Sequence, residues 1–173
     1  MADIADHPVP TIESLTDYQR AGHSWVAVDA GRPDDGRPDD GRPDDGRPDD
    51  GRPDDGRPDD GRPVGFILVK VVDGAAHIEQ VSVDPAHAHR RIGRDLIDHV
   101  EDWAAAQDLR RALTLTTFRD VQWNGPYYER LGFTVLAPAD HGPELASLMA
   151  DEAAHGLDPA HRIAMRRPIH HPR

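Results

Sequence analysis

The sequence predicts an α/β (α+β) domain in which helices flank a mixed, mostly antiparallel, twisted sheet. Two apolar strands are joined by Asp73-Gly74, a pair typical of a type I′ hairpin turn. The second strand ends at Asp84-Pro85, because proline cannot donate to a strand ladder, and a helix with one apolar face follows. An alternating strand comes next, as in a strand–helix–strand crossover. The 173 residues have room for a single domain, 1–173, with its own core.

Along the chain, the pattern predicts the order α-β-β-β-α-β-α-β-α-β, with a long repeat between the first two strands. Helices are expected where apolar residues recur at helical spacing, and strands where they alternate or cluster between turn residues. The expected helices cover 11–21, a stretch from Ile92 onward, 126–131 and 143–155. The expected strands cover 24–28, 64–69, 75–83, 112–118, 133–136 and 161–169. Such an order gives a mixed sheet with helices on both faces.

The helix from Ile92 follows a basic loop that is suited to a phosphate group. Its apolar face is formed by Ile92, Leu96, Ile97, Val100, Trp103 and Ala104. A helix N-terminus presents unpaired N–H groups and a partial positive charge. Arg90, Arg91 and Arg94 add guanidinium groups that match phosphate oxygens, and Gly93 lets a ligand approach the backbone closely. The alternative is an Arg-rich first helical turn that is simply solvated.

Composition excludes several classes of protein. The formal net charge of −12 argues against nucleic acid as a general partner. The chain has no cysteine, so it has no disulfide and no thiolate metal site, and the spacing of its histidines names no metal site either. The longest apolar run, 64–72, is too short to span a bilayer, and the N-terminus is acidic and unlike a signal peptide. We therefore expect a cytoplasmic protein without a membrane partner.

The pentapeptide Gly-Arg-Pro-Asp-Asp occurs six times without interruption over 31–60, and a partial copy follows over 61–63. Each copy carries one Arg, two Asp and no apolar residue to bury, so 31–63 is expected to be a disordered insertion. The expected strands on either side make the repeat an expansion of their hairpin turn. Lengthening a loop from about three to about thirty residues costs only roughly 2 kcal/mol of closure entropy. Weak Ca²⁺ binding by the Asp pairs, or a partner tether, is the functional alternative.

The basic loop resembles the acyl-CoA-binding motif of the GNAT family of N-acetyltransferases, Gln/Arg-x-x-Gly-x-Gly/Ala. The motif positions fall on residues 88–93. Two of them depart from the pattern, because Ala88 stands where Gln or Arg is usual and Arg91 replaces the first glycine. Arg90 can supply the side-chain charge that Ala88 lacks. A Cβ at position 91 is expected to weaken the cofactor contact.

A second segment, YYERLGF over 127–133, is similar to the family's Phe-Tyr-x-x-x-Gly-Phe signature. Pro126 suits the first position of the short helix, Gly132 suits the residue just past its end, and Asn124 is placed to cap it. The resemblance implies that Tyr128 is the phenol that protonates the departing CoA thiolate. Tyr127 is expected to pack beneath the helix.

The resemblance also implies a base on the strand that precedes the basic loop. Glu79 is the carboxylate on that strand, and it would act through a water molecule. Strand alternation puts it on the same face as Val81 and Val83 unless a bulge intervenes; the alternative is an ordinary surface glutamate. Backbone N–H groups near Val81 would stabilise the oxyanion. Because a chain without cysteine cannot form an acetyl-cysteine intermediate, the expected reaction is direct attack by the amine.

Taken as a family resemblance, these motifs imply a single N-acetyltransferase domain with the acyl-CoA N-acyltransferase fold and acetyl-CoA as co-substrate. Relatives have a strand and a helix before the helix expected at 11–21, so the first strand is expected to be missing or vestigial. The acceptor is expected to be a small-molecule or peptide amine, and homodimers are common among relatives. The alternatives are a non-catalytic acyl-CoA-binding module and an interaction protein that uses its acidic repeat. The residues expected to bind the cofactor are Val81, Val83, His89, Arg90, Arg91, Ile92, Gly93, Arg94 and Asn124.

Overall fold

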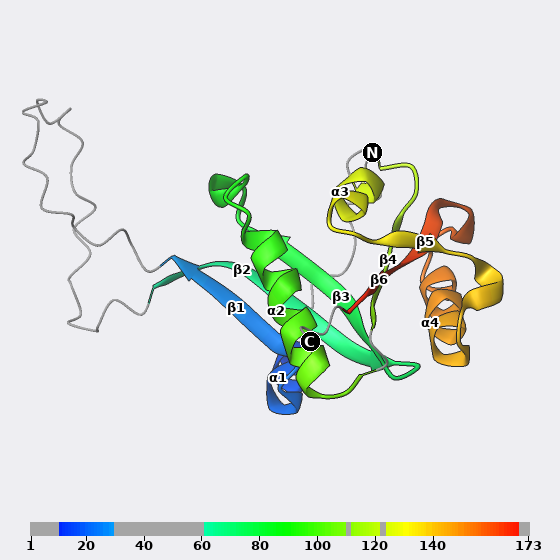
Figure 1. The fold of residues 1–173 in the computed structure, drawn as a ribbon, viewed down its shortest axis with the longest axis horizontal. Coiled ribbons are helices and arrows are strands. Elements are labelled where there is room, and N and C mark those ends of the chain that lie inside the picture. Colours follow the sequence, from blue (N-terminus) through cyan, green and yellow to red (C-terminus); the bar gives the residue numbers. More distant parts are fainter. Residues whose placement is uncertain (1–10, 30–60, 110–111, 122–123, 170–173) are drawn as a thin grey trace, which may run out of the picture.

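The structure, a computed structural model, describes residues 11–29, 61–109, 112–121 and 124–169 (Figure 1). Its strands form one six-stranded sheet in the order β1-β2-β3-β4-β6-β5. The strands are β1 (Ser24–Asp29), β2 (Arg62–Val72), β3 (Ala75–Val83), β4 (Ala112–Phe118), β5 (Thr134–Leu136) and β6 (Arg162–Pro168). The α-helices in these residues are α1 (Ile12–Ala21), α2 (Ile92–Ala106), α3 (Asn124–Arg130) and α4 (Pro143–Ala154). Short 3-10 turns lie at Pro85–His87, Pro138–Asp140 and Pro159–His161.

Neighbouring strands are antiparallel except for β3 and β4, which run parallel and are joined by the crossover through α2. A parallel pair needs such a crossover, whereas the β2–β3 hairpin needs only a two-residue turn. The mixed, mostly antiparallel sheet flanked by helices confirms the predicted fold class.

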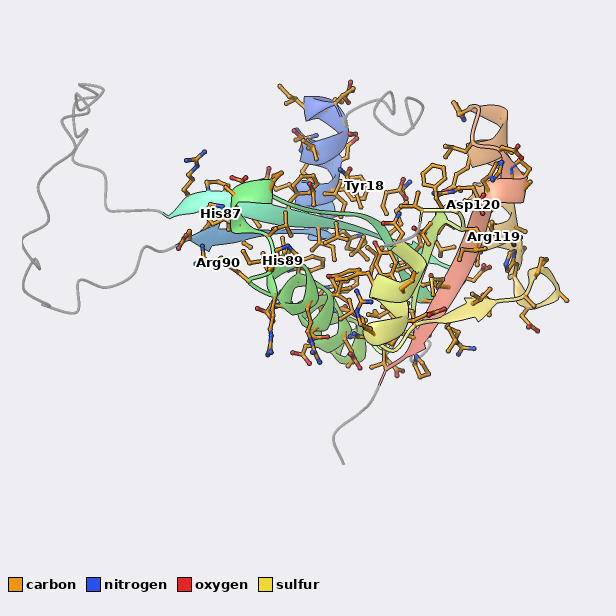
Figure 2. The ribbon with its side chains drawn as sticks, turned by 90° about the horizontal axis from the view of Figure 1, so that it is seen from above. Tyr18, His87, His89, Arg90, Arg119 and Asp120 are labelled. Atoms are coloured by element: carbon orange, nitrogen blue, oxygen red, sulfur yellow. The ribbon has the colours of Figure 1, made fainter. Side chains whose placement is uncertain are left out.

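The helices divide between the two faces of the sheet. Helices α2 and α3 pack on one face, which we call the α2 face, and α1 and α4 lie on the opposite one, the α1 face (Figure 2). The main core fills the space between α2 and the sheet. It contains the buried side chains of Ile67, Val69, Ile78, Leu96, Ile97, Val100, Leu113, Leu115, Phe133 and Met165. The apolar stripe predicted for α2 is therefore the stripe that is buried, and its burial holds the first turn of α2 beside the end of β3.

A nearly buried arginine connects α2 to the end of α3. Arg167, which is 7% exposed, donates hydrogen bonds to the Asp98 carboxylate at 3.0 Å, to Glu101 and to the Leu131 carbonyl at 3.1 Å. Its guanidinium also lies over the Phe133 ring. Since a buried guanidinium is expensive to leave unpaired, this cluster fixes where α3 sits relative to α2.

The hairpin turn between β2 and β3 also begins α4. Asp73 and Gly74 both have positive φ, 50° and 72°, as a type I′ turn requires. The Asp73 carboxylate accepts hydrogen bonds from the backbone N–H groups of Glu144 at 3.0 Å and Leu145 at 2.9 Å. These are donors that the first turn of a helix leaves unpaired. Gly142 packs so closely on this carboxylate that a Cβ there would collide with it.

Several predicted boundaries differ from the structure by one to three residues, and two of these differences bear on the site or on the insertion. Helix α3 begins at Asn124 and not at Pro126, which is its third residue; a first-turn proline is tolerated because its missing N–H has no partner there anyway. Strand β2 begins at Arg62, with Arg62 opposite Asp29 and Pro63 opposite Val28, so the last two residues of the predicted insertion are strand residues. The repeat over 31–60 lies outside the described residues.

Candidate active site

Strands β3 and β4 separate part-way along their length. Their parallel pairing covers Ala76–Leu113, His77–Thr114 and Ile78–Leu115. Beyond these pairs, β3 continues beside β2 to Val83 and β4 continues beside β6 to Phe118, so the strands diverge (Figure 1). The edge of β3 that faces β4 beyond Ile78 therefore has no ladder partner among the described residues. Backbone groups on such an edge are available to an extended ligand.

A β-bulge lies at the point of separation. Leu68 pairs with Gln80 and Val69 pairs with Ile78, which leaves Glu79 as the extra residue on β3. The bulge changes the alternation, so Val81 packs against the core on the α2 face while Glu79 pairs with Lys70 on the α1 face. Simple alternation would put Glu79 on the same face as Val81 and Val83. Because the bulge intervenes, it does not share that face.

Glu79 belongs to a polar array on the α1 face. Its carboxylate lies 3.0 Å from the Lys70 ammonium. Burial would lower the pKa of Lys70, but the hydrogen bond and the charge of Glu79 raise it overall. Burial raises the pKa of Tyr18 on α1, and the charge of Glu79 adds to that effect. Glu79 is thus a partly exposed carboxylate held by a cation.

The two largest cavities among the described residues open on the α1 face. One of about 640 Å³ lies between the sheet and α4 and contains Glu79, Lys70 and the acidic side chains Glu144, Asp151 and Glu152. The other, of about 720 Å³, lies between α1 and β2 and is lined mainly by apolar side chains, with Ser82 and Asp84 at one end. The first cavity is the one that holds a candidate base.

Two residues of the loop that leads into α2 have the left-handed backbone conformation that glycine adopts without strain. Arg91 stands at the N-cap of α2 with φ 66° and ψ 5°, and His89 has φ 65°. An L-residue in this left-handed region carries a steric cost that glycine avoids. Arg91 is exposed and makes no side-chain cap. Arg91 therefore holds a strained backbone conformation at the position where the family motif has glycine.

We expect Arg91→Gly to raise the free energy of unfolding by about 1 kcal/mol, because glycine relieves the left-handed strain. Chemical denaturation measures the change. Arg94→Gly is the matched control: Arg94 lies within α2, where glycine lowers helix stability, so the change should have the opposite sign. A less stable Arg91→Gly variant would contradict the statement that the backbone at Arg91 is strained.

Tyr127 reaches across from α3 to the first turn of α2. A Cβ placed on Gly93 would lie only 2.8 Å from the Tyr127 hydroxyl oxygen and 3.6 Å from Val83 Cγ2. Any side chain at position 93 would therefore push this phenol away. We expected Tyr127 to pack beneath α3, and its ring does pack against the core, but its hydroxyl lies at the basic loop. Nothing in the sequence signals this reach, since it depends on how α3 is placed beside α2.

Tyr128 is the more deeply placed phenol. Its ring makes edge contacts with Tyr127, at a centroid distance of 5.2 Å, and with Phe133, at 5.8 Å. Burial raises the pKa of Tyr128 to about 12, and Tyr127 adds to the shift. The phenol therefore stays protonated over any ordinary working pH.

The structure brings some of the predicted site residues together and separates others. Val83, Gly93 and Tyr127 meet, and Asn124 begins the same helix as Tyr127. Ile92 packs against the core, so only its backbone is available to a ligand. Arg94 lies 3.5 Å from Asp98, while Arg90 bonds to Asp29 at the end of β1. These two cations thus already have carboxylate partners.

Among the helices of the described residues, none is long and apolar enough to cross a membrane. Within the same ranges, no group of three or more His, Asp or Glu side chains is placed to hold a metal ion.

The architecture is that of the acyl-CoA N-acyltransferase fold, whose members include an acetyltransferase of the GNAT family from Staphylococcus aureus Mu50 (17% identity, TM-score 0.50, 64% of this chain and 62% of that one). The profile of the acetyltransferase (GNAT) family matches residues 12–133, which is more than half of the chain. The protein belongs to the GNAT acetyltransferase family.

Other solved structures agree on the fold. One is a Bacillus anthracis str. Ames protein assigned as a streptothricin acetyltransferase and solved with acetyl coenzyme A (20% identity, TM-score 0.50, 64% of this chain and 58% of that one). Another is N-acetylglutamate synthase from Neisseria gonorrhoeae, solved with coenzyme A and N-acetyl-glutamate (18% identity, TM-score 0.53, 65% of this chain and 24% of that one). The chain covers about three fifths of the first two structures.

Proposed function

We propose that this protein is an acetyl-CoA-dependent N-acetyltransferase that transfers the acetyl group to a primary amine by direct attack. The observation that carries the proposal is the separation of β3 and β4 beyond Ile78 and Leu115, flanked by the first turn of α2 and by the two phenols of α3. A thioester placed there would have backbone donors on one side and a buried acid on the other. Membership of the GNAT family and the relative solved with acetyl coenzyme A support the choice of donor.

The described residues fit the cofactor that the family implies. The free edge of β3 around Val81 suits an extended pantetheine arm, because strand edges pair with extended chains. The N-terminus of α2, with Gly93 and the guanidinium of Arg91 or Arg94, suits the pyrophosphate. Tyr127 adds a hydroxyl donor at the same place. Of the other residues expected to bind the cofactor, His89 lies in the loop before α2 and Asn124 begins α3.

The proposed base and acid lie on opposite faces of the sheet. On the α1 face, the amine would add to the thioester carbonyl, forming the C–N bond and an oxyanion, while its proton passes through water to Glu79 and then to solvent. The C–S bond would break when the oxyanion collapses. Tyr128 donates its proton to the leaving sulfur and is reprotonated from solvent. Backbone N–H groups near Val81 would stabilise the oxyanion, a type of contact that lowers the barrier by a few kcal/mol. Each positioned acid or base contributes roughly 10²–10⁴-fold.

The acceptor enters, in this proposal, through the cavity of about 640 Å³ on the α1 face. It holds Glu79, whereas the larger apolar cavity does not. Primary amines are mostly protonated near pH 7, and the carboxylates of Glu144, Asp151 and Glu152 attract an ammonium ion. Small-molecule and peptide amines both remain candidates. The cytoplasmic location and a homodimer stay predictions.

A thermal-shift and thiol-release experiment tests the function. The intact protein should be stabilised by acetyl-CoA and should release free CoA thiol when a panel of primary amines is supplied. Binding without thiol release for any amine would favour the alternative, a non-catalytic acyl-CoA-binding module. Absence of binding at millimolar acetyl-CoA would refute both.

We expect Glu79→Gln to lower kcat about 100-fold at pH 7, because the amide keeps the shape and the contact to Lys70 but cannot take a proton. The loss should shrink at higher pH, where more of the acceptor amine is already deprotonated. A pH–rate profile measures both effects. Glu129→Gln, which removes an exposed carboxylate from α3, is the control and should leave the rate unchanged. A pH-independent loss would argue against a role as base.

A further inference from the structure

The carboxylate of Asp29 stands at the cationic loop that precedes α2. Asp29 is the last residue of β1 and lies opposite Arg62 in the ladder with β2. Its Oδ2 atom accepts a hydrogen bond from Arg90 Nη1 at 3.0 Å and lies 3.3 Å from His87 Nε2. Figure 2 shows Arg90 and His87 together beside the end of β1. One oxygen thus faces two of the basic side chains of the loop between β3 and α2.

The contact joins parts of the chain that are far apart in sequence. Asp29 and Arg90 are 61 residues apart, and Asp29 comes directly before the long segment that separates β1 from β2. On its other side, the Nδ1 atom of His87 lies 3.4 Å from Asp84 Oδ2 without forming a hydrogen bond. The side chains of His87, Asp29 and Asp84 are at most 31% exposed, whereas that of Arg90 is 55% exposed. Arg90 is therefore the partner that can move.

A carboxylate and a phosphate compete for the same donors. The fork of a guanidinium binds either anion, and while Arg90 is bonded to Asp29, that Nη1 donor is turned toward β1. This competition lowers the affinity for a phosphorylated ligand at the N-terminus of α2.

We propose that Asp29 is an intramolecular competitor that holds Arg90 away from the phosphates of CoA, so that the cofactor must displace this ion pair in order to bind fully. The inference rests on the proposed function, because it concerns the same cofactor loop. Asp29 acts only through Arg90 and His87 and touches no reacting atom. The ion pair sets how tightly CoA is held and how strongly salt affects its binding.

The test is calorimetry of Asp29→Asn against wild type with CoA, and with pantetheine, which lacks phosphate groups. At low salt, the variant should bind CoA about three- to fivefold more tightly, the range expected for breaking a partly exposed ion pair near an anion site. Pantetheine should bind both proteins equally. Raising the salt to about 0.5 M should remove most of the gain, since the Debye length then falls to a few ångströms.

Asp17→Asn is the matched control, because it removes an exposed carboxylate on α1 that pairs with Arg20 and leaves the loop untouched. An equal gain in this control would mean that net charge alone is responsible, and would overturn the inference. The double variant Asp29→Asn/Arg90→Met should not show the gain in CoA affinity that Asp29→Asn shows over wild type. A gain that persists without Arg90 also overturns it.

The remaining outcomes separate this inference from the function on which it rests. Unchanged or weaker CoA binding by a folded Asp29→Asn variant would mean that Asp29 anchors the loop instead of competing, and the proposed function would stand. If neither protein binds CoA, the proposed function fails and the inference fails with it. Circular dichroism melting of each variant establishes that it is folded.

Discussion

Replacing Tyr128 with Phe is expected to lower kcat about 100-fold or more, while KM for acetyl-CoA stays within about twofold. The change removes one hydroxyl and keeps the ring that packs edge-on against Tyr127 and Phe133. Because burial raises the pKa of Tyr128 to about 12, the wild-type phenol is protonated throughout the range in which the enzyme can be assayed. In the proposed mechanism this protonated phenol donates to the leaving sulfur, and Phe cannot replace it.

Tyr127→Phe provides the comparison for this prediction, because it makes the same chemical change one residue earlier. Its hydroxyl lies at Gly93 beside the basic loop, so its loss should raise KM for acetyl-CoA a few-fold and leave kcat nearly unchanged. Steady-state kinetics with a thiol-release assay distinguish the two. If Tyr128→Phe kept more than half of the wild-type kcat, Tyr128 would not be the acid.

A second large effect is expected in the stability of the protein at acid pH. His77 is 1% exposed, and its Nδ1 atom lies 3.0 Å from Thr114 Oγ1. Burial lowers the pKa of His77 to about 4; the nearby carboxylates of Glu79 and Glu152 oppose this shift, and the charges of Lys70 and Arg162 add to it. Below pH 6.5 the unfolded chain binds a proton at this residue that the folded chain does not, so acid favours unfolding.

The stability that His77 contributes is therefore fully present above about pH 6.5 and is lost as the pH falls to about 4. The loss at pH 4 amounts to about 3 kcal/mol of the free energy of unfolding. Denaturant unfolding at several pH values, compared with His77→Asn, measures it. Asparagine can keep the bond to Thr114 but does not titrate. Between pH 7 and pH 4 the free energy of unfolding of the variant should therefore fall by about 3 kcal/mol less than that of the wild type. The test is the difference between the two proteins in the slope of the free energy of unfolding against pH, whatever the stability of the variant at pH 7. Equal slopes would show that His77 is accessible to protons in the folded state.

Local chemistry accounts for most of the element boundaries that could be predicted. Thr11 caps α1, with its side chain accepting a hydrogen bond from Ser14 N–H at 3.2 Å, and Gly22 ends that helix in the left-handed conformation. The Asp73-Gly74 turn and the apolar face of α2 were predictable for the same reason, since each depends on neighbours within a few residues. The start of α3 was not, because first-turn preferences at Asn124 and Pro126 allow more than one starting residue.

The site shows where such local rules stop. The motif residues over 88–93 and the tyrosine pair of α3 could be found from the sequence, because their types and spacing are chemically distinctive. The face on which Glu79 lies could not, because it depends on one extra residue in the pairing between β2 and β3. The partner of Arg90 could not be predicted either, since Asp29 lies 61 residues away in sequence.

By itself, the sequence determined the order of helices and strands, the apolar face of α2, and the family to which the protein belongs. The tertiary structure alone decided that β3 and β4 separate beyond Ile78, that the Tyr127 hydroxyl reaches Gly93, and that Asp29 holds Arg90. The physical reason is range: caps, turns and periodicity act between residues close in the chain, whereas register, helix placement and ion pairing depend on segments that meet only when the sheet is assembled.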